Sequence, residues 1–143
     1  MTEVIVRYLH FIGIILLAAT IFAEHLLIKA EMTAVEIRKM AIIDAIYGFA
    51  AIVVLVAGLS LWLWVGKPAA FYTANVLFHI KISAFVVLGL LSIYPTVFFV
   101  RHRKTTAVSV VVPKIIVQLI RAELALLAVI PLLAVLMARG YGL

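Results

Sequence analysis

The chain contains no cysteine. Disulfides, cysteine-ligated zinc and iron–sulfur clusters are therefore excluded, and so is the attachment of a c-type haem. Charged side chains are also scarce, at 13% of the residues, which is about half of the 25% typical of soluble domains. The sequence lacks the motifs of a zinc-peptidase helix, a glycine-rich phosphate loop and a nucleophile elbow. These absences disfavour a hydrolase and a nucleotide-driven transporter.

Hydrophobic residues make up 68% of the 143 residues, and the mean hydropathy is +1.33. Four segments reach the length of about 20 apolar residues that a helix needs to cross a bilayer. They cover residues 4–28, 40–65, 75–100 and 115–137. The connectors are short, so consecutive helices should run antiparallel as neighbours. The sequence predicts an all-α integral membrane protein, an antiparallel four-helix bundle that forms a single transmembrane domain over residues 1–143.

The lysines and arginines gather in the first and third connectors, which predicts that both connectors face the cytoplasm. These cations are Lys29, Arg38, Lys39, Arg101, Arg103, Lys104 and Lys114. The second connector has only Lys67, so this connector and both termini should face the periplasm of a bacterial inner membrane. The net charge of +6 is then explained by the cations that set the orientation of the helices in the membrane. It predicts contact with the lipid bilayer and not with nucleic acid.

Four glycines lie within the predicted spans. They are Gly13, Gly48, Gly58 and Gly89. Small residues let membrane helices approach closely, so we expect helix contacts at these positions.

Two histidines lie inside the predicted spans at similar depth. His10 and His79 are each about 6–9 Å from the same end of helices that run in the same direction. An ionisable residue inside the membrane indicates a functional site, and two imidazoles at one depth are candidate ligands of a metal or a haem. Arg7 and Lys81 are nearby cations, although His79 and Lys81 are about 200° apart on the helix and cannot point at one spot. The alternative is that each histidine only makes a hydrogen bond between helices.

A second group of polar residues lies in the second and fourth predicted spans, toward the end of the bundle where the basic connectors are expected. Asp44, Arg121 and Glu123 belong to it. They form either a buried ion-pair cluster that joins the second and fourth spans, or a proton path for a redox reaction. Glu24 and His25 follow the first apolar run, and we expect both at the membrane interface.

Two stretches carry a resemblance to known families. FHIKISAFVVLGLLSIYPTVFFVRHRK and IRAELALLAVIPLLAVLMARGYG, taken with YLH at residues 8–10, resemble an uncharacterised family of small bacterial four-helix membrane proteins. That family implies no activity. The chain resembles more distantly the HemJ-type protoporphyrinogen IX oxidases, which bind haem b. Their histidine in the first span and His-x-Lys step in the third map onto His10, His79 and Lys81.

The HemJ-type resemblance extends to the fourth span, where Arg121 and Glu123 match a polar step. Phe78 stands where a tryptophan is expected nearby, and Pro131 is well separated from Glu123. These departures weaken the transfer of an enzymatic activity more than the transfer of haem binding.

The resemblance implies a haem b redox protein that oxidises a porphyrinogen or exchanges electrons with a quinone. His10 would be the first axial ligand, and His79 the second ligand or a base on the substrate side. Lys81 and Arg7 would hold carboxylates. Whether the protein is an enzyme stays open. One alternative is a non-enzymatic accessory or assembly subunit. Another is a small permease that uses Glu24, Asp44 and Arg121 and needs a homo-oligomer to enclose a path.

Overall fold

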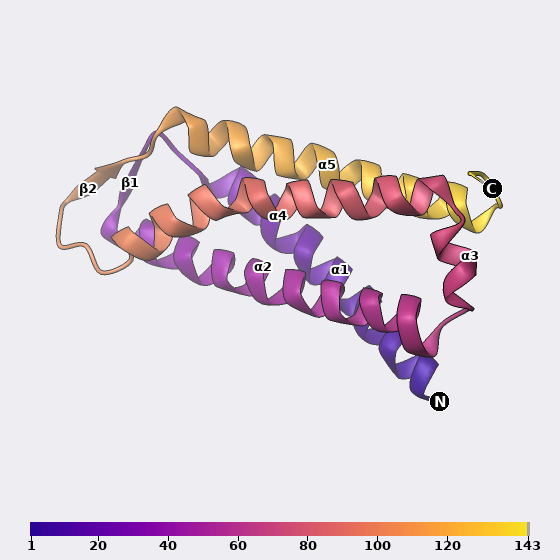
Figure 1. Ribbon diagram of the computed structural model, residues 1–143. Coiled ribbons are helices and arrows are strands. Elements are labelled where there is room, and N and C mark those ends of the chain that lie inside the picture. The colour runs from indigo at the N-terminus through magenta and orange to yellow at the C-terminus, as the bar shows by residue number, and fades with distance from the viewer. Residues whose placement is uncertain (143) are drawn as a thin grey trace.

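The computed structural model describes residues 1–142 and consists mainly of four long helices (Figure 1). All four are long and apolar enough to cross a membrane, which confirms the predicted all-α membrane bundle. They are α1 (Thr2–Leu27), α2 (Ala34–Ser60), α4 (Val76–His102) and α5 (Lys114–Ala138). A π-helical turn, Leu61–Val65, continues α2, and the short helix α3 (Ala69–Thr73) precedes α4.

The four long helices form a ring in which each packs against two others. α1 packs against α2 and α5, while α4 packs against α5 and α2. α1 and α4 therefore lie diagonally across the bundle. The buried core runs along its middle through Leu17, Tyr47, Leu88, Phe99 and Ile120. Large apolar side chains cover the outside, as expected for a surface that contacts lipid tails.

The first and third connectors pair with each other through two short strands that the sequence analysis did not predict. β1 (Glu31–Thr33) and β2 (Ser109–Val111) run antiparallel, with Glu31 opposite Val111. This pairing brings the two basic connectors together at one end of the bundle, which we call the connector end (Figure 1). Pairing of these connectors agrees with the up-down order of the helices.

A capping box starts α2 immediately after β1, which explains why α2 begins at Ala34 and not near residue 40. The Thr33 hydroxyl accepts a hydrogen bond from the Glu36 backbone N–H at 3.2 Å, and the Glu36 carboxylate accepts one from the Thr33 N–H at 3.0 Å. Two otherwise unpaired backbone donors are satisfied in this way. Glu36 also forms an ion pair with Lys29.

Both termini lie at the opposite end of the bundle, which we call the termini end (Figure 1). There the chain after α5 is fixed to the start of α4. The side chain of Asn75 is fully buried and donates to the Tyr141 carbonyl at 3.1 Å, and the Val76 N–H donates to the Gly142 carbonyl at 3.1 Å. Gly142 has a φ of +89°, a conformation that glycine adopts without strain.

Two of the four span glycines mark close helix contacts. A Cβ at Gly13 would lie 2.8 Å from the Val54 side chain, and a Cβ at Gly58 would lie 3.2 Å from the His10 ring. Both positions let α1 approach α2. The expectation is wrong for Gly48 and Gly89, where a Cβ would meet nothing within 4 Å.

Candidate functional site

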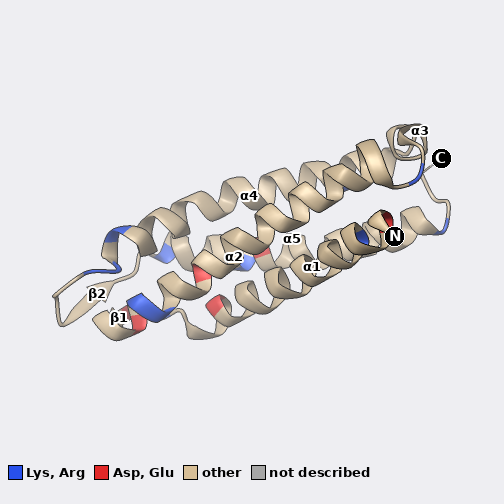
Figure 2. Ribbon diagram, turned by 90° about the horizontal axis from the view of Figure 1, so that it is seen from below, with Lys and Arg blue, Asp and Glu red and all other residues tan. Residues whose placement is uncertain are grey.

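Three acidic side chains from three different helices are buried in one part of the interior, toward the connector end. Glu24 on α1, Asp44 on α2 and Glu123 on α5 are 1%, 4% and 1% exposed. Figure 2 shows acidic positions on these helices in the same region of the bundle. Tyr47, one turn beyond Asp44, is 2% exposed and donates its hydroxyl to Glu123 Oε1 at 3.1 Å. We call these four residues the acid layer.

The carboxyl groups of the acid layer interact with one another. Glu24 lies within hydrogen-bonding reach of Asp44. It also lies close enough to Glu123 for electrostatic repulsion between the two carboxylates. A hydrogen bond between two carboxyl groups requires a proton on one of them. Among the described residues, Oε1 of Glu24 has no hydrogen-bond partner. Glu24 is therefore a deeply buried polar group with an unsatisfied acceptor.

No basic side chain in the described part of the chain forms an ion pair with the acid layer. Within residues 1–142 the ion pairs are Arg7 with Glu3 and Lys29 with Glu36, and both lie near helix ends. Several negative charges cannot be buried close together in a low dielectric without a counter-charge. In the same residues, no group of three or more His, Asp or Glu side chains is arranged to hold a metal ion. Protonation of these carboxyl groups would remove the buried negative charge.

Arg121 does not join this layer, contrary to the predicted ion-pair cluster. Its side chain is exposed, whereas Glu123 faces the core. The two residues are two positions apart on α5, which corresponds to about 200° of helix rotation, so they cannot both face inward. Glu24 is 1% exposed and therefore faces the protein interior, although it lies only three residues before the end of α1.

A second group of polar side chains lies in the interior toward the termini end. His10 is half-buried, and its Nδ1 lies 3.1 Å from the Val54 carbonyl of α2. Lys81 of α4 is also half-buried and lies near enough to act electrostatically on the His10 ring. Its Nζ is 5.9 Å from the centre of the Phe78 ring. We call His10 and Lys81 the base layer.

His79 lies outside the base layer. Its side chain is exposed, and its Nε2 lies 2.8 Å from the Thr73 carbonyl at the end of α3. The structure therefore brings Lys81, and not His79, from α4 toward His10. Arg7 is half-buried and pairs with Glu3 at 2.7 Å. The predicted roles of His79 and Arg7 in holding a cofactor stay predictions.

The sequence analysis did not assign Tyr47 to a site, and it assigned Glu24 only to the permease alternative. A signal for each was present. Tyr47 follows Asp44 by three residues, which places both on one helix face. Glu24 shares a helix direction with His10 and Leu17, and polar groups in a membrane helix face the bundle interior.

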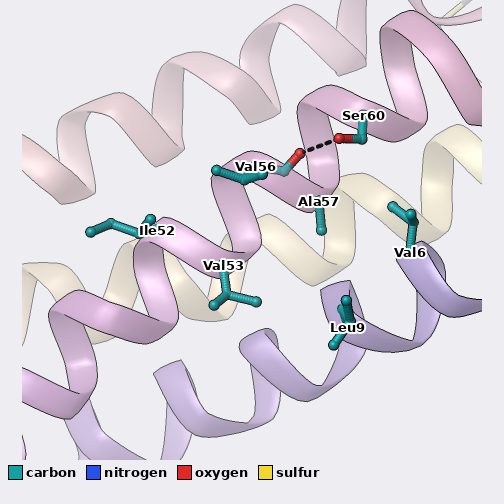
Figure 3. Close-up of a pocket in the computed structure, with 7 residues that line it drawn as sticks. All are labelled: Val6, Leu9, Ile52, Val53, Val56, Ala57 and Ser60. Carbon is teal, nitrogen blue, oxygen red and sulfur yellow. Dashed lines mark hydrogen bonds between the residues drawn. The ribbon is translucent and has the colours of Figure 1, made fainter.

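The groove between α1 and α2 is a separate feature. It holds a cavity of about 300 Å³, and Figure 3 shows the residues that line it. Its lining is Val6, Leu9, Ile52, Val53, Val56, Ala57 and Ser60. The Ser60 hydroxyl donates a hydrogen bond to the Val56 carbonyl at 2.8 Å. The rest of the lining is apolar. No residue of the acid layer or the base layer lines this groove.

A comparison with protein families gives a match over nearly the whole chain. A family model described as "Predicted membrane protein (DUF2214)" matches residues 2–142. The chain belongs to this family. The match confirms the resemblance to an uncharacterised membrane protein family and assigns no activity. No curated protein and no solved structure matches the chain. The more distant HemJ-type resemblance has no support from these comparisons.

Proposed function

We propose that this DUF2214 protein is a multi-pass membrane protein that binds protons at its acid layer and relays them through the bundle. The observation that carries this proposal is the burial of Glu24, Asp44 and Glu123 side by side without a cation. Such a group is expensive in a membrane interior unless it is protonated, and intramembrane carboxyls of this kind mark proton paths. Tyr47 supplies a hydroxyl that can pass a proton to Glu123.

The relay would connect the two ends of the bundle through the base layer. His10 has a ring nitrogen that can accept a proton and lies on the same inward face of α1 as Glu24. The basic connectors favour an orientation with the connector end in the cytoplasm of a bacterial inner membrane. The acid layer would then lie on the cytoplasmic side, and the base layer on the periplasmic side.

Proton flux into liposomes tests this function. The purified full chain is reconstituted with a trapped pH-sensitive dye, and a potassium gradient with valinomycin drives proton entry. We expect flux well above that of protein-free liposomes, and a strong reduction in Glu123→Gln. Glu31→Gln is the matched control, because Glu31 is an exposed acid in β1 outside the acid layer. Equal flux in protein-free, wild-type and Glu123→Gln liposomes would contradict the proposal.

A haem b redox protein is the second candidate, and the geometry of His10 is the observation that favours it. The Val54 carbonyl at 3.1 Å from Nδ1 would hold the ring so that Nε2 is available, as is usual for metal-binding histidines. His10 would supply a nitrogen ligand to the iron, and Lys81 would supply a cation for a carboxylate of the bound group. Bound haem would supply electron transfer, for example with a porphyrinogen or a quinone.

A visible spectrum of protein expressed with ample haem tests this second candidate. We expect a Soret band that His10→Ala removes and that the exposed His79→Ala retains. Absence of the band, or a band unchanged in His10→Ala, would contradict it. If the variants weaken only folding or association, with neither flux nor chromophore, the accessory-subunit alternative gains support.

A further inference from the structure

One face of α5 carries a polar stripe on the outside of the bundle. Lys114, Gln118 and Arg121 are all exposed and follow each other at spacings of four and three residues, which places them on one side of the helix. Arg121 lies about 10 Å along α5 from Lys114, at 1.5 Å per residue. The flanking Ile120 and Glu123 are buried. The stripe thus runs from the helix end into the part of α5 expected to contact lipid.

The chain has no acid that can neutralise Arg121. It contains six acidic residues, and three of them form the buried acid layer. Glu3 pairs with Arg7 and Glu36 pairs with Lys29. Glu31 lies in β1, opposite Val111 of β2. It takes part in no ion pair within the described residues. The counter-charge for Arg121 must therefore come from outside the molecule.

A second copy of the chain could not supply that counter-charge at the depth of Arg121. The acids on the surface are Glu3, Glu31 and Glu36, and all lie near helix ends or in β1. An arginine at this depth turns its guanidinium toward the headgroup region. Guanidinium groups bind phosphate oxygens through two parallel hydrogen bonds, and Lys114 adds a charge at the headgroup level.

We propose that Lys114, Gln118 and Arg121 bind the phosphate of an anionic phospholipid from the leaflet at the connector end. Arg121 forms the paired hydrogen bonds, Gln118 donates its amide, and Lys114 holds the lipid's net negative charge. The cations of both connectors lie at the same end, so the local field favours anionic over zwitterionic headgroups. This inference is independent of proton transfer through the acid layer.

Native mass spectrometry of the full chain in detergent tests the inference. The protein is titrated with phosphatidylglycerol or with phosphatidylcholine of the same acyl chains. We expect phosphatidylglycerol to be retained preferentially, and Arg121→Gln to reduce its binding about fivefold. Arg139→Gln is the matched control, because it removes the same charge from the exposed residue that follows α5 at the opposite end. This control should bind phosphatidylglycerol like the wild type.

A conservative variant separates charge from geometry. Arg121→Lys keeps the charge and loses the paired hydrogen bonds, so its binding should lie between wild type and Arg121→Gln. If Arg121→Gln does not fold, Arg121→Lys and the lipid preference of the wild type still decide the question. Equal binding of both lipids by the wild type would overturn the proposal. Equal losses in Arg121→Gln and Arg139→Gln, or a lipid-free dimer that Arg121→Gln dissociates, would also overturn it.

Discussion

The acid layer and the base layer occupy opposite halves of the same interior and are built differently. The acid layer draws on α1, α2 and α5, and its members are at most 4% exposed. The base layer draws on α1 and α4, and His10 and Lys81 are only half-buried. Neither layer contains a side chain of the opposite charge in the described part of the protein. The interior therefore separates acids from bases instead of pairing them.

This separation differs from the buried ion-pair cluster that the structural interpretation of these charges predicts. An ion pair would be the simplest way to keep a charge in a membrane helix, and Arg121 is only two residues from Glu123. The fold nevertheless turns Arg121 outward and leaves the acids without a cation. Buried carboxyl groups without a cation are expensive unless protons neutralise them. We propose that these protons exchange with the surroundings.

The strongest test of the difference between the layers compares Glu24→Gln with His10→Gln. Glu24→Gln removes a carboxyl from the centre of the relay and should lower proton flux about a hundredfold, the usual contribution of a positioned proton-transfer group. His10→Gln should have a smaller effect, because water can reach the half-buried base layer. The liposome assay measures both. Equal losses in the two variants would contradict the distinction between the layers.

Helix α1 approaches α2 closely at Gly13, next to the base layer, because both Gly13 and His10 contact Val54. Gly13→Ala should lower the free energy of unfolding by about 2 kcal/mol, because its Cβ overpacks against Val54, at 2.8 Å. Gly48→Ala is the control, since a Cβ there meets nothing within 4 Å. Thermal unfolding in detergent, followed by circular dichroism, reports both. A Gly13→Ala protein as stable as Gly48→Ala would contradict the close packing.

Loss of the hydrogen bond inside the acid layer should lower the free energy of unfolding less than Gly13→Ala does. Tyr47→Phe removes the donor to Glu123 and should cost about 1 kcal/mol, the scale of such bonds between membrane helices. Tyr94→Phe is the matched control, because Tyr94 is 50% exposed and should lose nothing. The same unfolding measurement applies. Identical stabilities of the two variants would show that the Tyr47 bond contributes nothing.

The smallest effect is expected at the termini end, next to the base layer. A side chain at Gly142 would collide with Asn75 and Leu77, whereas a Cβ at Gly140 meets nothing within 4 Å. Gly142→Ala should loosen the terminal segment more than Gly140→Ala, with little effect on the rest of the protein, because a short terminal segment can detach locally. Hydrogen exchange at the Val76 amide checks this, since that amide donates to the Gly142 carbonyl. Equal protection in both variants would contradict the contact.

The sequence predicts the four helices well because long apolar runs leave few alternatives in a bilayer. It also predicts that polar groups on α1 face inward, since His10, Leu17 and Glu24 share one helix direction. The β1–β2 pairing is not predictable from local patterns. Its two strands have three residues each and lie in connectors far apart in the sequence.

The site was harder to predict where two polar residues lie two positions apart on one helix, because they point to nearly opposite sides. His79 and Lys81 are two residues apart on α4, as Arg121 and Glu123 are on α5. In each pair only one residue can face the core, and helix phase alone does not choose between them. Packing decides: α4 turns Lys81 inward, and α5 turns Glu123 inward. The assignment of His79 and Arg121 to the interior rested on residue type instead of on this geometry.

Infrared difference spectroscopy tests the central claim most directly, because it observes the protonated carboxyl group itself. At neutral pH the wild-type protein should show the carbonyl stretching band of a carboxylic acid shielded from solvent. Glu24→Gln should remove or shift that band, and Glu31→Gln should leave it unchanged. A wild-type spectrum with carboxylate bands alone, or a band that Glu24→Gln, Asp44→Asn and Glu123→Gln all leave untouched, would contradict a proton-binding acid layer.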